Sequence, residues 1–551
     1  MMMMTSSSSK RTMPSLRLLL LLLLVGYASG SNILVLSPYT CKSHSNFFMP
    51  IVKTLASRGH TITYWNGLEP KAPMANVRQL FSESLRELNT NYDVEFGRNN
   101  PLLMFLDFPS RVSRLCSLCF QEPIFHQLMA GSEQFDLIIV EAVLNECMLP
   151  LVSRLNVPFI YLNSIMPTPW MLDAVGSPML FDHVPVVSTD FTDQMYLYQR
   201  LWNTLTGVFM ITFRNAFILP RVNEAAAKYG VGQHLPPIGQ VEKNVSLLIT
   251  NSHLSINYQF AKPAAIIEAG GLHCVARKPL PDDLQDFVGG SGDAGFIYLS
   301  FGSILRGADL PEATKRVFVN VFARLPQRVI WKYEDEAGMA DLPANVKLVS
   351  WLPQQDLLGH DNIKLFISHG GLFSIQETVY HGVPFIGLPV FADQFNNVVK
   401  AERDGYARFM NWDSLTEQAL YDTIRDMVTQ SKYRERIQHA SLLLRDQPSR
   451  PLDRAIFWIE YVIRHGGATH LHTAVRHQPL YQRALLDVTM LMACIFALLA
   501  WAGYRLLRSM CCASFRSSAS STSCSSSSAS SGISSADLDP ASSKKNPRFS
   551  G

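Results

Sequence analysis

The chain has 551 residues, 47% of them hydrophobic, which is enough for two domains of ordinary size with filled cores. Its 48 basic and 45 acidic residues give a formal net charge of +3, without a strong bias in the body of the chain. This balance gives no indication of a nucleic-acid partner, and that class of function is excluded first.

The first residues have the order of a secretory signal peptide. Basic residues such as Arg11 and Arg17 precede an apolar run at 18–25, and small residues follow it up to Gly30. The run is far shorter than the roughly 20 residues that a bilayer requires, which argues against an anchoring helix. Residues 1–30 are therefore predicted to be removed, and the body of the chain is expected in the secretory pathway.

From Ser31 onward, short apolar runs rich in β-branched residues alternate with helical stretches. Such alternation is typical of βαβ units around a parallel sheet. Residues 31–265 are predicted to form one doubly wound domain, interrupted by poorly periodic segments at about 70–134 and 164–239. The pattern predicts strands at 32–38, 61–65, 135–141 and 158–163, with helices at 47–57 and 145–155.

A second series of the same kind follows Gly271, and residues 266–450 are predicted to form a second α/β domain. Open parallel sheets bind ligands at the carboxyl ends of their strands, so two such domains indicate a cleft between them. The pattern predicts strands at 295–301, 329–333, 346–351, 364–368 and 383–388, and a helix at 311–325.

The segment 290–295 matches the dinucleotide-binding fingerprint GxGxxG letter for letter. The fingerprint requires a strand before it and a helix after it, whereas here a strand follows. We interpret this segment as a loop, and the hypothesis of a nicotinamide-dependent dehydrogenase loses its main support.

Residues 484–507 predict one membrane-spanning helix, because their central part, 488–504, is uncharged and arginines flank it on both sides. Residues 508–551 are rich in Ser and predict a disordered tail, since this composition cannot bury enough apolar surface. With the signal peptide, these features predict a single-pass type I protein with a lumenal body and a cytoplasmic tail.

The lumenal part is predicted to hold an odd number of cysteines, so at least one thiol is free unless pairing is intermolecular. Asn244 begins an Asn-Val-Ser glycosylation acceptor. The lumenal cysteines are Cys41, Cys116, Cys119, Cys147 and Cys274.

No motif favours a metal ion. Cys116 and Cys119 form one CxxC without a second pair, which favours neither zinc nor a redox site. Residues 451–483 are predicted to be returning helices and a juxtamembrane linker, and we interpret their histidines as solvated linker residues. These histidines are His465, His470, His472 and His477.

One constellation does indicate a ligand. His369, Gly370 and Gly371 follow a predicted strand and open a helix, where two glycines and exposed amides suit a phosphate. Glu377 lies on that helix in reach of a ribose, and Trp351 offers a ring for a base.

Three further side chains complete this constellation. Gln354 places an amide beside the base, and Asp393 and Gln394 reach the same sheet edge with groups for sugar hydroxyls. A stacking ring, a ribose acceptor, a phosphate turn and hexose acceptors together indicate a nucleotide sugar.

The segment 351–394 (WLPQQDLLGH…LFISHGGLFSIQETVYHGVPFIGLPVFADQ) resembles the signature of the UDP-glycosyltransferases, the microsomal family that includes the glucuronosyltransferases. The resemblance extends to 270–274, to 300–303 and to the stretch after Pro451. It implies an α/β fold of the GT-B type, with two Rossmann-like domains facing a cleft and one C-terminal transmembrane helix. It also implies an N-terminal acceptor domain, a C-terminal donor domain, and inverting transfer without a metal ion or other cofactor.

The resemblance implies roles for individual residues. Trp351 and Gln354 are expected at the uracil, Glu377 at the ribose, and Asp393 and Gln394 at the transferred sugar. His369 and Ser303 are expected at the diphosphate, with Gly370 and Gly371 in the same turn.

Two positions depart from the vertebrate pattern. Phe373 stands where those enzymes have a phosphate-contacting Asn, so Ser374 is the expected replacement. Phe260 stands where relatives carry an Arg, and Lys262 is the nearest substitute.

The resemblance also implies a catalytic base. His44, expected in the loop after the first strand, occupies the family's base position. An acidic side chain should orient its ring. Glu141, at the end of a strand, is the favoured partner, and Glu146 is its rival.

These features predict hexose transfer from a UDP-sugar, preferably UDP-glucose, to hydroxyl groups of small lipophilic acceptors. Apolar segments at 102–108 and 165–180 are candidates for the acceptor pocket, with core packing as the equal alternative. UDP-glucuronate as donor, or a catalytically silent lumenal carrier of lipophiles or UDP-sugars, remain the alternatives.

The resemblance places the protein in the endoplasmic reticulum membrane with its catalytic domains in the lumen. Lys544 and Lys545 lie too far from the C-terminus for a dilysine retrieval signal. The acceptor and the oligomeric state, whether monomer, homo-oligomer or hetero-oligomer, stay open.

Overall fold

The computed structural model describes residues 30–90, 101–187, 189–231, 233–303, 305–335, 339 and 341–519. The chain up to Gln478 forms one compact unit, and the chain from Pro479 forms a second. The predicted signal peptide, apart from Gly30, and the predicted tail beyond Ala519 lie outside the described residues.

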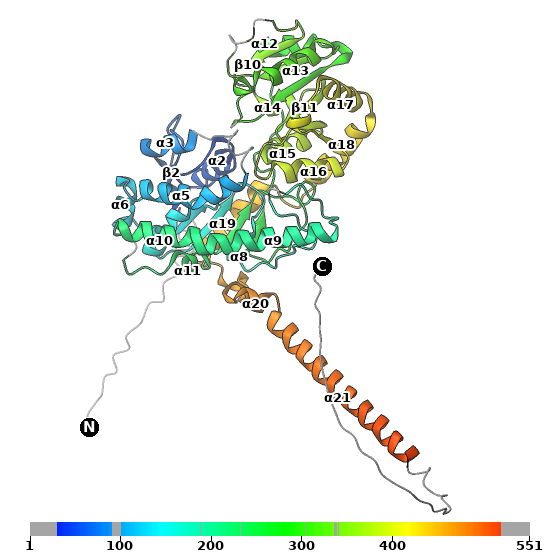
Figure 1. Ribbon diagram of the computed structural model, residues 1–551. Helices are drawn as coiled ribbons and strands as arrows, with labels where there is room; N and C mark the ends of the chain where they lie inside the picture. Colours follow the sequence, from blue (N-terminus) through cyan, green and yellow to red (C-terminus); the bar gives the residue numbers. More distant parts are fainter. Residues whose placement is uncertain are drawn as a thin grey trace, which may run out of the picture. The chain divides into compact units, whose positions relative to one another are not determined.

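A seven-stranded parallel sheet forms the centre of the first domain (Figure 1). Its strand order is β3-β2-β1-β4-β5-β6-β7. Alternate residues of a strand face opposite sides, and so Leu34 and Leu36 of β1 join one core cluster while Ile33 and Val35 join the other. The strands are β1 (Asn32–Ser37), β2 (Thr61–Asn66), β3 (Val77–Leu80), β4 (Leu137–Glu141), β5 (Phe159–Asn163), β6 (Leu247–Thr250) and β7 (Ile266–Glu268).

Helices cover both faces of this sheet, and a disulfide between Cys116 and Cys147 ties α5 to η1. The helices are α2 (Lys42–Ser57), α3 (Glu83–Thr90), α5 (Pro101–Cys119), α6 (Pro123–Met129), η1 (Glu146–Met148), α7 (Leu149–Leu155), α8 (Pro169–Ala174), α9 (Leu197–Phe213), the π-helical η2 (Arg214–Ile218), α10 (Leu219–Lys228) and α11 (Ile238–Glu242).

The second domain contains a six-stranded parallel sheet with the order β10-β9-β8-β11-β12-β13. Its strands are β8 (Phe296–Ser300), β9 (Arg328–Lys332), β10 (Val346–Val349), β11 (Ile363–Ser368), β12 (Phe385–Gly387) and β13 (Ala407–Phe409). Its helices are α12 (Asp282–Gly289), η3 (Gly292–Ala294), η4 (Gly307–Asp309), α13 (Glu312–Ala323), α14 (Gln354–Leu358), α15 (Leu372–His381), α16 (Gln394–Arg403), η6 (Trp412–Ser414), α17 (Glu417–Thr429) and α18 (Ser431–Arg445).

The chain then returns to the first domain through α19 (Pro451–Arg464), η7 (Thr469–Leu471) and η8 (Ala474–His477). The buried face of α19 packs in the same core cluster as Phe47 and Ile51 of α2. Arg58 adds an ion pair to Glu460, with 3.1 Å between Nη1 and Oε1.

Hydrogen bonds join the two domains directly. Gln376 on α15 accepts from the amide of Gly271 (3.1 Å) and donates to the carbonyl of Asn251 (3.2 Å). On α16, Asn396 donates to the carbonyl of Val186 (3.3 Å). The carboxyl ends of both sheets therefore face a shared boundary. Open parallel sheets bind their ligands at these ends.

The structure differs from the sequence-based assignment in several places. β7 belongs to the first sheet, so that sheet extends past the predicted domain boundary at 265. The short strands β3, β6, β7 and β13 were not predicted, whereas the equally short β10 and β12 lie inside the predicted runs at 346–351 and 383–388. The GxGxxG segment contains η3 and leads into β8, which confirms its interpretation as a connection before a strand.

The second unit consists of α20 (Leu480–Arg483) and α21 (Leu486–Ala519). Leu485 has a φ of 52°, and this left-handed residue sets the start of α21, later than the predicted 484. Within α21, residues Leu486–Cys512 are long and apolar enough to cross a membrane, with a mean hydropathy of 1.9. The helix continues past the predicted end at 507, so residues 508–519, which were predicted to begin the disordered tail, are helical.

Candidate active site

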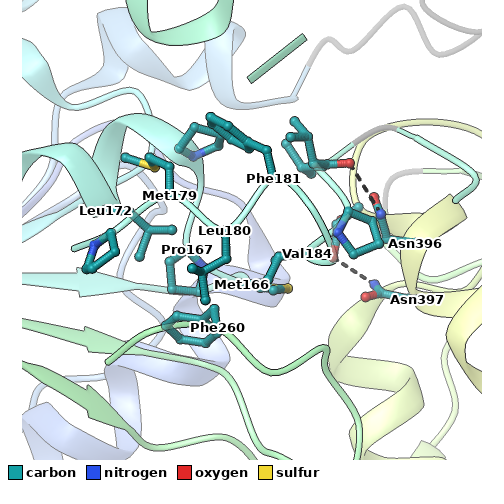
Figure 2. A pocket seen from close by; sticks show the side chains of 16 residues that line it. Met166, Pro167, Leu172, Met179, Leu180, Phe181, Val184, Phe260, Asn396 and Asn397 are labelled. Carbon is teal, nitrogen blue, oxygen red and sulfur yellow. Dashed lines mark hydrogen bonds between the residues drawn. The ribbon is translucent and has the colours of Figure 1, made fainter. Parts of the chain in front are cut away.

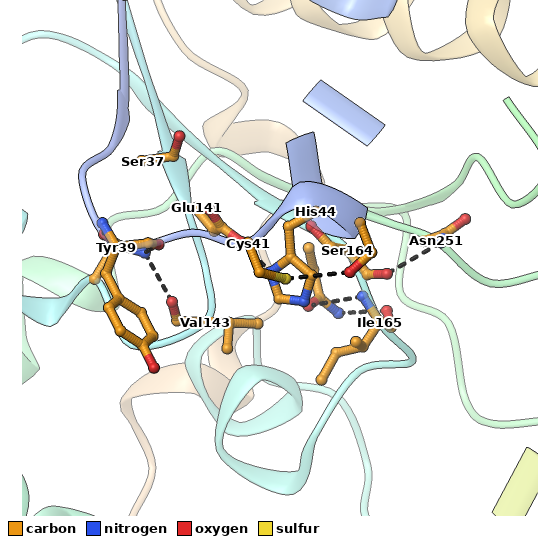
Figure 3. A network of polar contacts seen from close by, with 12 residues as sticks. Ser37, Tyr39, Cys41, His44, Glu141, Val143, Ser164, Ile165 and Asn251 are labelled. Atoms are coloured by element: carbon orange, nitrogen blue, oxygen red, sulfur yellow. Dashed lines mark hydrogen bonds and ion pairs between the residues drawn. The ribbon is translucent and has the colours of Figure 1, made fainter. Parts of the chain in front are cut away.

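His44 and Glu141 meet at the carboxyl edge of the first sheet (Figure 3). Glu141 is the last residue of β4 and is fully buried, while β1 beside it leads into α2. Nδ1 of His44 contacts Oε1 of Glu141 in a short hydrogen-bonded ion pair. The side chain of His44 keeps 18% of its surface exposed, so the ring is not completely enclosed.

His44 lies in a helix, not in the loop that the sequence predicted. The predicted helix starts at 47, whereas α2 starts at Lys42 and places His44 in its first turn. Ser43 and Ser45 lie in the first turns of this helix, and because Ser generally favours turns over helix interiors, the polar stretch was mistaken for a loop.

The charges around His44 alter its pKa. Burial alone would lower it, but the thiolate of Cys41 and the carboxylate of Glu141 raise the His44 pKa well above its usual value. Burial raises the pKa of the Cys41 thiol, while His44 and a contact with Ser43 (3.1 Å) outweigh it and lower that pKa to about 7. A buried carboxylate that contacts one ring nitrogen leaves the other nitrogen available for a proton transfer.

Glu146 does not contact His44 in the described structure. Its Oε1 lies 3.2 Å from Nη2 of Arg214, and the same guanidinium makes an ion pair of 2.7 Å with Glu242. All three side chains are buried. Glu146 is the first residue of η1, five residues after the end of β4. Its carboxylate belongs to this buried cluster of charges.

His369, Gly370 and Gly371 connect β11 to α15. Gly370 has a φ of 80°, a left-handed conformation that favours glycine, and Gly371 caps the N-terminus of α15. The amides of the first turn of this ten-residue helix face the carboxyl edge of the second sheet. Burial and the charge of Lys332 lower the His369 pKa to about 4, so its ring is neutral at physiological pH.

Ser303 lies in the turn after β8, the neighbour of β11 in the sheet. Gly302 beside it has a φ of 80°, and a Cβ there would stand 2.6 Å from the ring of His369. The two turns therefore approach each other closely, and the exposed Ser303 lies at the same sheet edge as His369.

Gln354, Ser374 and Glu377 form one hydrogen-bonded group. Nε2 of Gln354 donates to Oγ of Ser374 (3.1 Å) and to Oε2 of Glu377 (2.5 Å). The Gln354 carbonyl oxygen accepts from the hydroxyl of Tyr298 (3.1 Å). Burial raises the pKa of Glu377 to about 7, although hydrogen bonds from Gln354 and Gln355 oppose that shift.

Trp351 follows β10, which ends at Val349 and not at Trp351 as predicted. Its side chain is 63% exposed, and so one face of the ring can receive a flat ligand. Two cations lie near the ring: Nζ of Lys42 at 5.3 Å and Nζ of Lys332 at 5.6 Å from its centroid. Lys42 is the first residue of α2, so it comes from the opposite domain.

Asp393 and Gln394 open α16 after a strained residue, Ala392, whose φ is 56°. Asn397 donates to Oδ2 of Asp393 (2.8 Å). Burial raises the Asp393 pKa, while the hydrogen bond from Asn397 and the charge of His44, which belongs to the other domain, oppose that shift. Oε1 of Gln394 accepts from the amides of Val390 (2.7 Å) and Phe391 (3.2 Å), which leaves only its amino group for a ligand.

Two residues that the sequence reasoning did not single out, His273 and Asn397, contact members of the candidate site. His273 is buried, and its Nε2 stands 3.5 Å from Oε1 of Glu377. Asn397 orients Asp393. His273 could have been found, because it lies within the 270–274 segment that carries the resemblance, whereas Asn397 has no signal beyond its helical spacing from Asp393.

The two departures from the vertebrate pattern have defined surroundings. The ring of Phe373 packs on that of His273, with 4.9 Å between centroids, and also contacts a core cluster of the first domain. Lys262 forms an ion pair with Glu268, and Phe260 is buried against an apolar cavity. At position 373, packing between the domains thus takes the place of the polar contact that the vertebrate pattern has there.

That cavity, of about 40 Å³, lies between the first domain and α16 (Figure 2). Apolar residues between Met166 and Val187 form most of its wall, and Asp393 lies at its polar side. The predicted segment 165–180 therefore supplies part of the wall. Of the other predicted segment, 102–108, Phe108 packs against the core instead, and the side chains up to residue 105 lie outside the described part.

Across the residues that the structure describes, no group of three or more His, Cys, Asp or Glu side chains is arranged to hold a metal ion.

Solved structures place this architecture among the GT-B glycosyltransferases. A UDP-glucose: anthocyanidin 3-O-glucosyltransferase in complex with UDP matches 80% of this chain and 100% of its own, with a TM-score of 0.53 and 15% identity. At this identity the likeness shows the fold alone, and it confirms the predicted fold class.

The sequence comparisons define the family. The profile described as "UDP-glucoronosyl and UDP-glucosyl transferase" matches residues 42–518. A "UDP-glucosyltransferase 2" of Dactylopius coccus is 34% identical over 84% of this chain and 90% of its own length. The human "2-hydroxyacylsphingosine 1-beta-galactosyltransferase" is 31% identical over 88% and 91%. The chain belongs to the UDP-glycosyltransferase family and is an enzyme of that class, as the resemblance implied.

Proposed function

We propose that this UDP-glycosyltransferase transfers glucose from UDP-glucose to a hydroxyl group of a small lipophilic acceptor, with inversion and without a metal ion. The contact between His44 and the buried Glu141, together with the electrostatic effect of His44 on Asp393 of the other domain, carries the proposal. His44 supplies a base of raised pKa on one side of the domain boundary. On the other side, Asp393 supplies a carboxylate that can accept hydrogen bonds from the hydroxyls of the transferred sugar.

In the proposed reaction, the free nitrogen of His44 takes the proton of the acceptor hydroxyl as its oxygen attacks C1 of the sugar. The bond between C1 and the diphosphate oxygen breaks on the opposite face, and UDP leaves with the electron pair. Glu141 stabilises the imidazolium that forms. The charge on the departing diphosphate is stabilised by the neutral His369, Ser303 and the amides at the start of α15.

The remaining contacts hold the donor. Trp351 stacks on the uracil, and Gln354 and Glu377 hold the nucleoside, with Glu377 accepting from the ribose hydroxyls. Asp393 and the amino group of Gln394 bind the hexose. Ser374 already accepts from Gln354, so its contact with the diphosphate would require that hydrogen bond to be exchanged.

Two observations support the finer assignments. A relative that carries the name of a glucosyltransferase matches most of the chain, which supports glucose over glucuronate as the transferred sugar. The cavity beside Asp393 has an apolar wall, which supports a lipophilic acceptor, although its volume of about 40 Å³ would have to widen to admit one. The body is proposed to lie in the lumen of the endoplasmic reticulum, anchored by α21.

The test uses the purified full-length chain with UDP-glucose, UDP-glucuronate and UDP-galactose against a panel of phenols, with and without EDTA. We expect turnover with UDP-glucose, a β-configured product from the α-configured donor by NMR, and rates that EDTA does not change. Faster turnover with UDP-glucuronate would reverse the donor assignment.

The alternative of a silent carrier is favoured by one observation, the apolar Phe373 at a position expected to be polar. Binding of UDP-sugar without product for any donor and acceptor would support that carrier and overturn the enzyme proposal.

A further inference from the structure

Helix α9 exposes an unusual amount of apolar surface for a helix of a folded domain. Large apolar side chains on one side of it are between 42% and 76% exposed. Successive members are one, three or four residues apart, and this spacing keeps all of them on one helical face. This set, the α9 face, consists of Leu197, Leu201, Trp202, Leu205, Val208 and Phe209.

The α9 face has almost no charge to keep it in water. Between Tyr196 and Phe213 the sequence has one charged residue, Arg200, whereas the shorter α17 carries Glu417, Asp422, Arg425 and Asp426. Contiguous exposed apolar patches of this kind mark interaction surfaces.

Its aromatic residues indicate which partner fits. Tyr196, Tyr198 and Trp202 are 72%, 68% and 62% exposed, next to exposed leucines and Arg200. Tyr and Trp beside apolar side chains, with an Arg that can reach water, are the composition of a helix lying in a membrane interface.

The connection to α21 limits the distance between this side of the domain and a membrane. Thr473 donates to the carbonyl of Gly176 (3.1 Å), and Arg476 donates to the carbonyl of Lys243 (2.7 Å), so the chain is held on the first domain up to Arg476. Gly176 lies two residues after the end of α8, which packs on α9. The membrane-spanning candidate begins at Leu486, ten residues later, and ten extended residues span at most about 35 Å.

The opposite side of α9 lies on the wall of the apolar cavity. Asn203 donates to the carbonyls of Phe181 (2.9 Å) and Val184 (2.8 Å), and both residues line the cavity. A Cβ on Gly207 would stand 2.2 Å from the ring of Phe181, which shows how closely the helix approaches this wall. The exposed apolar face of α9 and the cavity wall therefore lie on opposite sides of the same helix.

We propose that the α9 face lies in the surface of the lipid bilayer, as a second membrane contact in addition to α21, and that it places the acceptor cavity beside the bilayer. The inference rests on the proposed membrane anchorage and lipophilic acceptor. A lipophilic acceptor concentrated in the bilayer would then reach the cavity without crossing bulk water.

The test separates the α9 contact from the anchor. The full-length chain carries a protease site inserted between Gln478 and Pro479 and is reconstituted in phosphatidylcholine and phosphatidylethanolamine vesicles with its body outside. After cleavage, flotation measures how much of the released body stays with the vesicles. We expect most of it to float, and the triple variant L201E/W202E/L205E to lower the floating fraction about tenfold or more.

A matched variant carries the same charge change on other exposed apolar residues, L442E/L443E/F457E, whose side chains are 67%, 45% and 50% exposed. Its body should float like the unchanged protein. Release of the unchanged body on cleavage, or equal flotation of both triple variants, would overturn the inference.

Activity in detergent micelles reports separately on folding and on the proposed function. Both triple variants should keep the turnover of the unchanged protein there, because none of the substituted residues belongs to the candidate active site. An inactive but membrane-retained body would count against the enzyme proposal alone, and extraction of the uncleaved chain by alkaline carbonate would count against the anchor alone.

Discussion

The two α/β domains share one architecture but place their candidate site residues differently. In the second domain, His369, Gly371, Glu377 and Asp393 follow one another within a short stretch of chain, through two adjacent strands. In the first domain, His44 and Glu141 are 97 residues apart and meet because β1 and β4 are neighbours. A ligand site built from one local stretch can be recognised in a sequence, whereas a site built from strand order requires the fold.

The comparison also separates their expected roles, with donor binding in the second domain and chemistry in the first. Substitutions should therefore divide into those that change turnover and those that change donor affinity.

The largest effect is expected for His44→Ala. Loss of a general base should lower kcat by about 10³-fold, within the usual 10²–10⁴ range, while UDP affinity stays unchanged. Initial rates and calorimetric titration with UDP measure the two quantities. Unchanged turnover would remove His44 from the reaction.

Glu141→Gln should lower kcat by about 100-fold, because the amide does not stabilise the imidazolium. Glu141 raises the His44 pKa, so the wild-type rate should increase as pH rises through a value above the usual 6.5, where the ring loses its proton. In the variant, this rise in rate should occur at lower pH. A pH profile of kcat/KM checks it.

Glu146→Gln is the matched control for that experiment. It weakens the buried contact with Arg214, and it should lower the thermal midpoint while leaving the pH at which the rate rises unchanged. A shift of that pH in this variant would make Glu146 the partner of His44.

Glu377→Gln should raise the donor KM by about tenfold, corresponding to the loss of one charge-assisted hydrogen bond. In the wild type, the Glu377 pKa of about 7 means that the carboxylate ionises as pH rises through neutrality, and the donor KM should fall over that range. The neighbouring His273, whose pKa burial lowers to about 4, stays neutral there. The variant should lose this dependence, and its acceptor KM should not change.

The smallest effect on activity is expected for Cys147→Ser. The disulfide with Cys116 holds α5 on η1 in the first domain, and its loss should cost about 2–5 kcal/mol of unfolding free energy without changing kcat at low temperature. Denaturant unfolding with intact and reduced protein measures the effect. Equal stability of the two would show that packing alone holds this contact.

Much of the fold followed from the sequence because its strands are buried on both faces. Continuous apolar runs such as those of β1, β4 and β11 predict a parallel sheet directly. Short strands such as β7 and β13 did not, since their pairing depends on neighbours far away in the chain. The α9 face was also missed, because α9 lies in the segment 164–239, which was interpreted as a poorly periodic interruption of the domain.

The sequence by itself determined the two α/β domains, the donor-site stretch from Trp351 to Gln394 and the family, because these depend on local order along the chain. Tertiary structure decided that Glu141 and not Glu146 contacts His44, that His44 opens a helix, and that Phe373 packs between the domains. It also decided which face of α9 meets solvent. Each of these depends on which strands and helices are neighbours, and hydrophobic periodicity along a chain does not specify that arrangement.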